Sequence, residues 1–253
     1  MSDLRLFNLK KDQLETKSTI DKLSLQKLMG SHLDRLMGIT LIDNDFTLTD
    51  TITEKVETFG YDENYRLTII EYRIGKFSGI VSKGFMFLDY IMNNQGKVKS
   101  ILSEKLGYDL VKQLNFFPRL IIIGEDFNKY DEYAIKQMPY VVELIKYQLF
   151  EKQFLVIEKI YQSKKIYGDD AIKLNELQKQ FSDFVLSLGD EVCEERTANF
   201  ICFRKIKAFA YLYEQEALML NVLQNGKYKT YKITSQKDLT KVEDLVERSY
   251  DEN

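Results

Sequence analysis

The run Leu120-Ile121-Ile122-Ile123 constrains the fold of this chain more than any other sequence feature. It is apolar at every position and short, which is typical of a strand buried on both faces of a sheet. Segment 77–92, which comes before it, carries apolar residues at the three-and-four spacing of a helix, and segment 98–106 is also helical in character. The run therefore predicts the centre of the sheet in an α/β domain.

Other predicted elements surround this central strand. They are a helix over 19–37, strands over 39–48, 51–59 and 65–72, a helix over 131–138, and strands over 141–150 and 154–160. Gly38 is a plausible stop for the first helix. Tyr61-Asp62-Glu63-Asn64 predicts the turn of an antiparallel meander. Residues 1–160 are therefore expected to form one domain with a mixed sheet.

The pattern changes after residues 161–170, a polar stretch that we interpret as a linker. A helix is expected over 172–188 and ends at Gly189, several short strands follow over 192–233, and a last helix contains Leu239, Val242, Leu245 and Val246. The sequence thus predicts a small α+β domain with an antiparallel sheet over residues 171–253.

The composition is that of a globular protein. The chain has 253 residues, of which 44% are hydrophobic and 30% charged, and this length favours two domains. It contains no apolar stretch of membrane-spanning length and no signal-peptide run in its first residues. The two cysteines, Cys193 and Cys202, are too few for a disulfide framework and are expected to be buried thiols. We expect a cytoplasmic protein without a membrane partner.

Several classes of chemistry are excluded by the residues that the chain lacks. His32 is the single histidine, so histidine-based triads and histidine-rich zinc sites cannot be assembled, and His32 itself is expected at the surface of the first helix. The sequence contains neither of the two common glycine-rich phosphate-binding motifs, GxxxxGK[ST] and GxGxxG, so a phosphate-binding loop of either kind is excluded. The chain has 36 Lys and Arg against 39 Asp and Glu, a net charge of −3, which argues against strong general nucleic-acid binding and leaves a local basic groove open.

The candidate chemistry lies on the hairpin of the meander. Side chains at i and i+2 of a strand point to the same face, so Glu71 and Arg73 project together. A turn at Tyr61–Asn64 places Glu57 across from them. Two carboxylates and a cation suit Mg²⁺, which takes carboxylate ligands and keeps waters that can attack a phosphodiester. The alternative is an ordinary set of charged residues on the exposed face of a half-buried hairpin.

The motif Glu57-x13-Glu71-x-Arg73 on a hairpin followed by a helix resembles the PD-(D/E)XK, or restriction-endonuclease-like, nuclease superfamily. The resemblance implies a restriction-endonuclease-like α/β domain over 1–160, with Glu57 and Glu71 as ligands of Mg²⁺ or Mn²⁺. Arg73 and Lys83 would then complete the catalytic set.

Over nearly its whole length the chain is similar to a prokaryotic family of unknown function, often labelled "predicted transport protein". This family joins such a nuclease-like domain to a small C-terminal domain. The similar segments are 83–90, 118–123 and 126–132 in the first half, and 188–190, 203–210 and 245–250 in the second.

The chain departs from the nuclease pattern at four positions. Glu57 replaces the usual Asp, Arg73 the usual Lys, Lys83 a Gln, and Gly30 stands where the first helix often offers an acid. An arginine stays charged and cannot act as a tunable ammonium near an attacking water, whereas Lys83 would restore an ammonium to the site. These departures imply at most weak Mg²⁺ or Mn²⁺ binding and leave open whether the site is active or degenerate.

Two other groups of residues are candidates for a functional role. Asp126, Tyr130 and Asp131 follow the central strand, where polar residues often line a site, but Asp126 is a better candidate for a helix cap than for a ligand. Arg204, Lys205 and Lys207 alternate with aromatic residues at Phe200, Phe203 and Phe209. They would form either a stacking surface for single-stranded nucleic acid or, as we favour, a strand with aromatic residues inward and cations outward.

The sequence thus supports two hypotheses of different classes. The first is a nuclease-related protein that binds or cleaves nucleic acid through a degenerate divalent-metal site at Glu57 and Glu71. The second is a catalytically inactive interaction module that retains the nuclease fold, with a second copy or another protein as partner. A transport role rests on the family label alone, and no predicted membrane segment supports it. Divalent-metal binding separates the first two hypotheses.

Overall fold

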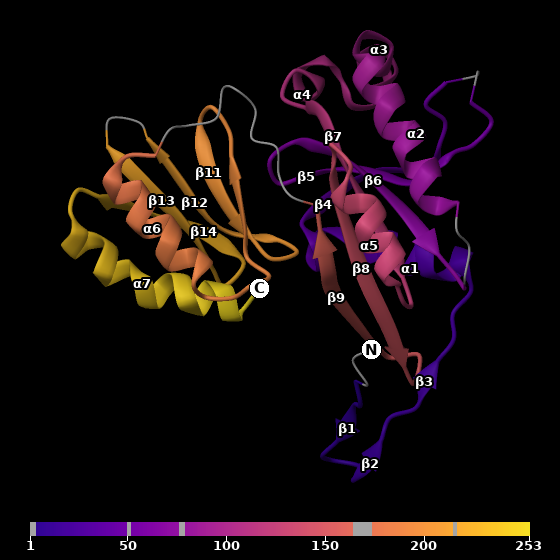
Figure 1. Ribbon diagram of the computed structural model, residues 1–253, viewed down its shortest axis with the longest axis horizontal. Helices are drawn as coiled ribbons and strands as arrows, with labels where there is room; N and C mark the ends of the chain where they lie inside the picture. Colours follow the sequence, from indigo (N-terminus) through magenta and orange to yellow (C-terminus); the bar gives the residue numbers. More distant parts are fainter. Residues whose placement is uncertain (1–3, 50–51, 76–78, 164–173, 215–216) are drawn as a thin grey trace. The chain divides into compact units, whose positions relative to one another are not determined.

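The computed structural model describes residues 4–49, 52–75, 79–163, 174–214 and 217–253. The chain divides into two compact units, one formed by residues 1–35 and 39–164 and the other by residues 36–38 and 165–253 (Figure 1). Residues 164–170 of the predicted linker lie outside the described residues. Within those ranges, no helix combines the length and the apolar character that crossing a membrane requires.

The first unit is built on a mixed seven-stranded sheet with the order β3-β8-β7-β6-β5-β4, and β9 also pairs with β8. Its central strand is β7 (Asn115–Gly124), which runs parallel to both β6 (Arg66–Arg73) and β8 (Val141–Phe150). The predicted apolar run 120–123 is fully buried in it. The prediction of a sheet centre at this run is confirmed, and so is the α/β class.

The remaining strands of this sheet pair antiparallel to their neighbours. They are β3 (Lys17–Ser18), β4 (Ile39–Phe46), β5 (Val56–Asp62) and β9 (Phe154–Gln162). A separate two-stranded sheet is formed by β1 (Phe7–Asn8) and β2 (Gln13–Leu14). The last strand of the sheet thus continues two residues beyond the predicted domain end at residue 160.

The turn between β5 and β6 lies further along the chain than predicted. Strand β5 continues to Asp62, and Tyr65 takes the left-handed conformation with φ 57°. Asp62 holds this turn together because its Oδ1 accepts hydrogen bonds from the backbone N–H groups of Asn64 and Arg66. A turn-forming aspartate explains why β5 ends three residues later than the predicted strand 51–59, although it also begins later, at Val56.

Among the described residues, the helices of the first unit are α1 (Lys22–Met37), α2 (Ile80–Asn93), α3 (Gln95–Leu106), α4 (Tyr108–Val111) and α5 (Lys129–Lys136). Helix α1 ends at Gly38, which has φ 64°, as expected. Helix α2 packs on β6 and β7. Gly84 permits this close packing, since a Cβ atom there would lie 2.4 Å from Leu120 Cδ2. Helix α2 is therefore held close against β6, the second strand of the hairpin, and against β7.

The second unit is a five-stranded antiparallel meander covered by two helices. Its strands are adjacent in sequence order and are β10 (Cys193–Arg196), β11 (Phe200–Arg204), β12 (Ala208–Glu214), β13 (Leu218–Gln224) and β14 (Lys227–Ile233). Helices α6 (Glu176–Leu186) and α7 (Gln236–Asp251) lie on the same side of this sheet (Figure 1). Their apolar residues share one core with the inward side chains of the sheet.

The two cysteines differ in burial. Cys202 is fully buried in β11, whereas Cys193 is partly exposed at the start of β10. The expectation of two buried thiols is therefore wrong for Cys193, which lies in a short edge strand with only one neighbouring strand to cover it. His32 is exposed on α1, as predicted.

Candidate functional site

The hairpin of β5 and β6 brings Glu57 and Glu71 side by side. Its register pairs Thr58 with Ile70, which puts the two glutamates on neighbouring positions of the same face. The backbone N–H of Glu57 donates to Glu71 Oε1 at 3.2 Å, and the backbone N–H of Tyr72 donates to Glu57 Oε2 at 2.8 Å. These bonds fix both carboxyl groups relative to the backbone.

Both carboxyl groups are buried. Only 6% of Glu57 and none of Glu71 is exposed to solvent. The alternative of solvated charges on an open face of the hairpin is therefore wrong. A buried carboxylate must be paired with hydrogen-bond donors or positive charge, because desolvation of an isolated charge is very costly.

The main partner of both glutamates is Lys83 of α2. Its Nζ lies 3.0 Å from Glu57 Oε1 and 2.7 Å from Glu71 Oε2. The same Nζ lies 5.6 Å from the centre of the Phe87 ring, one turn further along the helix. One ammonium group therefore bridges the two carboxyl groups.

A second ammonium, from Lys22, also contacts Glu57 Oε1. Lys22 begins α1, and its side chain is about half exposed. Lys22 is distant in sequence from the hairpin and belongs to no motif, so the sequence gives no signal for its place in this site. Residue Gln26, one turn along α1, donates to the backbone oxygen of Glu57, so the start of this helix is anchored on β5.

Arg73 lies on β6 beyond Glu71, but its guanidinium pairs elsewhere. Its Nη1 is 2.7 Å from Asp131 Oδ2, and its Cζ is 5.4 Å from the centre of the Phe127 ring. The ion pair with Asp131 keeps the Arg73 guanidinium away from the two glutamates, and the cation that contacts both of them is Lys83. The structure thus brings three of the four predicted catalytic residues into direct contact and places Arg73 in a separate ion pair.

The start of α5 explains why Asp131 is available to Arg73. Asn128 is the N-cap residue, and Asn128 and Asp131 form a reciprocal capping box. The expectation that Asp126 caps this helix is wrong, since Asp126 lies two residues earlier and pairs with Lys146 at 3.7 Å. Tyr130 is largely exposed.

The two glutamates have opposite pKa shifts. Burial, together with the negative charge of Glu57, raises the pKa of Glu71 to about 8. Burial also opposes ionisation of Glu57, but hydrogen bonds from Lys22 and Tyr72 and the charge of Lys83 outweigh it and lower its pKa. Burial alone would lower the pKa of Lys83, but the hydrogen bonds and negative charges of Glu71 and Glu57 outweigh burial, so the pKa of Lys83 is raised overall. Glu57 is thus the ionised partner, and Glu71 keeps its proton to higher pH.

These residues do not fit a divalent cation. A hard cation needs several oxygen ligands, yet Lys83 Nζ lies within hydrogen-bonding distance of both carboxyl groups. A protonated lysine is not a ligand, and its charge repels a second cation. Among the described residues, no group of three or more histidine, cysteine, aspartate or glutamate residues is arranged to hold a metal ion.

Gly30, where an acid is often found in the family pattern, lies against β4. A Cβ atom at this position would be 3.3 Å from Asn44 Nδ2. The side chain of Asn44 in turn accepts a hydrogen bond from Thr58 through its Oδ1, at 2.8 Å. An amide thus lies beside Gly30, and it is bonded to a neutral hydroxyl group on β5.

The basic and aromatic segment of the second unit follows the inward-aromatic interpretation only in part. Phe203 and Phe209 are fully buried, whereas Phe200 is partly exposed. Arg204 is also buried and lies 3.7 Å from Glu195, so the expectation of outward cations is wrong for this residue, which pairs within the sheet. Lys205 lies over the Tyr250 ring and donates to the Tyr250 backbone oxygen at 2.7 Å, and Lys207 is partly exposed. These side chains do not form a continuous basic surface.

Comparison with known proteins gives one relative of uncharacterized function. The chain is 23% identical over 186 residues to an uncharacterized protein of Haemophilus influenzae, and the match covers 71% of this chain and 60% of the relative. The chain therefore spans less than two thirds of the length of that relative. No protein-family model matches the chain, and no solved structure matches it.

Proposed function

We propose that the first unit is a nuclease-related domain whose acidic site is closed by a lysine, and that the protein acts as an interaction module. The observation that carries this proposal is the ammonium of Lys83, which lies 3.0 Å from one carboxyl oxygen of Glu57 and 2.7 Å from one of Glu71. In a working nuclease of the kind that the motif resembles, a divalent cation occupies the space between these carboxyl groups.

Electrostatics supports a stable closed site. Lys83 and Lys22 supply two positive charges to one ionised and one largely protonated carboxyl group, so the cluster already carries no excess negative charge at neutral pH. A divalent cation would have to displace an ammonium that is hydrogen-bonded to two buried groups. Such displacement removes charge-assisted bonds, each worth roughly 1.5–3 kcal/mol.

The position of Arg73 also supports the loss of catalysis. Its guanidinium is held by Asp131 and lies against Phe127. It therefore supplies neither a proton acceptor nor a tunable ammonium beside the carboxyl pair. What remains is a folded surface on a stable sheet, which suits binding rather than cleavage.

A nuclease that binds or cleaves nucleic acid with a divalent metal is the second candidate. It is favoured by the direct approach of Glu57 and Glu71, which meet as the motif requires. Under this hypothesis Lys83 moves aside when the metal and the nucleic acid bind.

Calorimetric titration with Mn²⁺ distinguishes the two functions. We expect no binding by the wild type, and weak binding by Lys83→Gln, which removes the ammonium and leaves both carboxyl groups. The double variant Lys83→Gln with Glu71→Ala is the control and should lose that binding. Tight binding by the wild type, lost in Glu71→Ala and accompanied by Mn²⁺-dependent cleavage of plasmid or single-stranded DNA, would establish the nuclease instead.

A further inference from the structure

The first unit contains a cavity between the segment that follows β4 and the helices α2 and α3. Its volume is ≈ 490 Å³, within the size range of small-ligand sites. Residues 47–49 supply one part of the wall, Tyr90 of α2 a second, and Lys97, Ser100 and Ile101 of α3 a third. Neither Glu57 nor Glu71 is among the described residues that line it. The cavity is therefore a different site from the acidic pair.

The floor of this cavity is apolar and belongs to the core of the first unit. Leu48 is 1% exposed and is a member of the core cluster. Tyr90 and Ile101 are partly buried and pack against the same cluster. Side chains that are already held by the core lose little conformational freedom when a ligand binds. The floor thus suits the apolar part of a ligand.

Helix α3 adds polar side chains at the rim. Val98 and Leu102 are fully buried in the core, and Ile101 packs against the same core. Residues three and four positions apart are neighbours on a helix surface, so Lys97 and Ser100 lie on the same side of α3 as Ile101. Both are exposed. They therefore border the apolar floor on its solvent side.

The polar groups of this cavity are free to bind a ligand. Within the described part of the chain, the hydroxyl groups of Thr47, Tyr90 and Ser100 have no hydrogen-bond partner, and Lys97 has no ion-pair partner. No aspartate or glutamate is among the described lining residues. An ammonium group has only donors, and a hydroxyl group can donate as well. The cavity thus offers donors and one positive charge to a ligand that carries acceptors.

The other lysines of α3 are engaged elsewhere. Lys99 Nζ lies 4.9 Å from the centre of the Phe116 ring, and Lys105 forms an ion pair with Asp43. Lys97 is therefore the lysine of this helix that remains for the cavity. One ammonium suits one anionic group, whereas a nucleic-acid backbone requires several cations along its run of phosphates.

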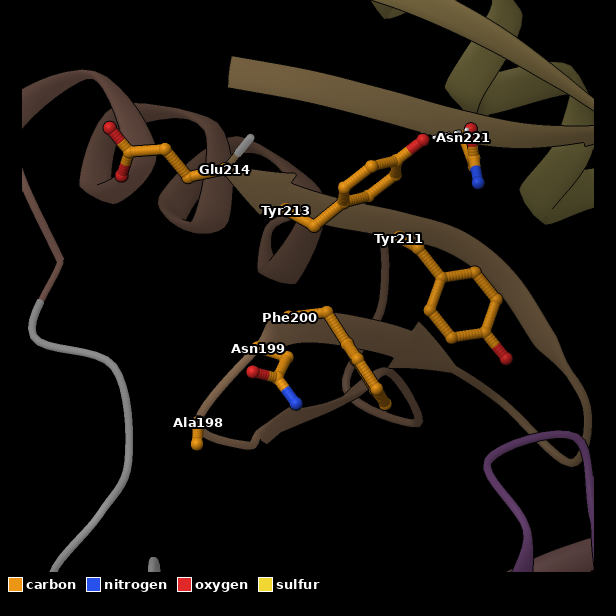
Figure 2. A pocket seen from close by; sticks show the side chains of 7 residues that line it. All are labelled: Ala198, Asn199, Phe200, Tyr211, Tyr213, Glu214 and Asn221. Atoms are coloured by element: carbon orange, nitrogen blue, oxygen red, sulfur yellow. Dashed lines mark hydrogen bonds between the residues drawn. The ribbon is translucent and has the colours of Figure 1, made fainter. Parts of the chain in front are cut away.

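A cavity of the same volume in the second unit does not show such a preference. Phe200, Tyr211 and Tyr213 line it, and Glu214 supplies the one carboxylate among its described lining residues. Figure 2 shows that the side chain of Glu214 is directed away from the rings of Phe200 and Tyr211. Its charge does not face a ligand held by the rings. The cavity of the first unit is therefore the site whose chemistry selects a class of ligand.

We propose that the cavity between residues 47–49 and helices α2 and α3 binds a small organic anion with an apolar body, of the kind found in a carboxylic acid or a phosphate monoester. The anionic group pairs with Lys97 and accepts hydrogen bonds from the hydroxyl groups, since bonds to a charged group are the stronger ones. The apolar body lies against Leu48, Tyr90 and Ile101 and leaves water. This inference goes beyond the function proposed for the first unit and does not depend on it.

Ligand-observed NMR on the full-length protein tests the charge and the apolar body together. The probe is phenylacetate, and its matched control is phenylacetamide, which has the same shape without the charge. We expect phenylacetate to bind, phenylacetamide to bind roughly threefold more weakly, and acetate, which lacks the ring, to show no binding. Tighter binding of phenyl phosphate than of phenylacetate assigns the site to phosphate monoesters, and the reverse order assigns it to carboxylates. Equal binding of phenylacetate and phenylacetamide, or no binding of either anion, overturns the proposal.

Two variants locate the binding. Lys97→Gln removes the charge and should weaken phenylacetate binding by roughly twofold to fivefold, with phenylacetamide binding unchanged. Lys99→Gln is the matched control, because it removes the same charge from the same helix where the lysine lies over Phe116, and it should leave both unchanged. Ser100→Phe fills the cavity from an exposed position and should prevent binding of both compounds, with a thermal melt to verify folding. Unchanged phenylacetate binding in Lys97→Gln, or retained binding in folded Ser100→Phe, overturns the assignment of this cavity.

Discussion

At the scale of single residues, one lysine supplies the positive charge that pairs with both Glu57 and Glu71. Lys83 is the group that contacts both buried carboxyl groups, and it does so from a helix rather than from the hairpin. Lys22 contacts only Glu57 and is more exposed. Lys83 thus pairs with two buried carboxyl groups, whereas Lys22 pairs with one of them.

We expect Lys83→Met to lower the free energy of unfolding by about 1–3 kcal/mol at neutral pH, because both glutamates lose a charged donor. The loss is limited because Glu71 can keep its proton. Lys22→Met is the matched control and should cost less than about 1 kcal/mol, since its ion pair is half exposed. Urea denaturation measures both, and equal losses in the two variants would contradict the bridging role of Lys83.

The raised pKa of Glu71 makes stability depend on pH. The folded chain holds the Glu71 proton up to about pH 8, whereas the ordinary value of this group is 4.5. Between these values the folded state binds more protons than the unfolded state, so this contribution to stability is complete below the lower value and is lost as pH rises toward the upper one.

Glu71→Gln should remove this dependence, because the amide does not titrate. Relative to the wild type, we expect the variant to gain stability steadily from about pH 5 to about pH 8, by a few kcal/mol at most. Denaturant midpoints measured across this range in both proteins provide the test. Parallel curves would mean that Glu71 is ionised in the folded state throughout.

At the scale of elements, α2 positions the lysine, and Gly84 positions α2. A Cβ atom on Gly84 would lie 2.4 Å and 2.7 Å from the two methyl carbons of Leu120, which is fully buried in the central strand. The methyl groups have little room to move in such a core. The glycine next to Lys83 thus fixes how close the ammonium comes to the hairpin.

Gly84→Ala should therefore destabilise the protein by about 1–3 kcal/mol, despite the higher helix propensity of alanine. Gly96→Ala in α3 is the matched control, because no atom lies within 4 Å of a Cβ there. That variant should gain up to about 1 kcal/mol. Thermal melting of the two variants gives the comparison, and similar changes in both would show that α2 moves freely over the sheet.

At the scale of the whole molecule, each unit has a core of its own. The core of the second unit contains Phe181 and Val185 of α6, Val246 of α7, and the inward side chains of β11, β12 and β13. A unit that buries its own apolar residues is expected to fold by itself.

A fragment of residues 174–253 should accordingly fold and unfold in one cooperative transition. Circular dichroism during heating measures this transition, and Phe203→Ala, which opens a cavity in the same core, should lower the melting temperature of the fragment. A fragment without a cooperative transition would show that the second unit depends on the first.

The sequence by itself determined the elements and the pair of glutamates. Period-two and period-3.6 patterns depend on neighbours along the chain, so the buried run 120–123, the helices around it and the second antiparallel sheet could be predicted. The spacing of Glu57 and Glu71 across one turn was also sufficient to bring them together, even though the turn itself lies further along the chain than expected.

Only the tertiary structure decided which cations serve the pair. Arg73 lies on the same face of β6 as Glu71, but its guanidinium forms an ion pair with Asp131, which is distant in sequence. Lys22 and Lys83 come from two different helices whose placement depends on packing, and no local pattern encodes that placement. Contacts between distant segments depend on how whole elements pack, and for this reason the charge and the chemistry of this site could not be predicted from the sequence.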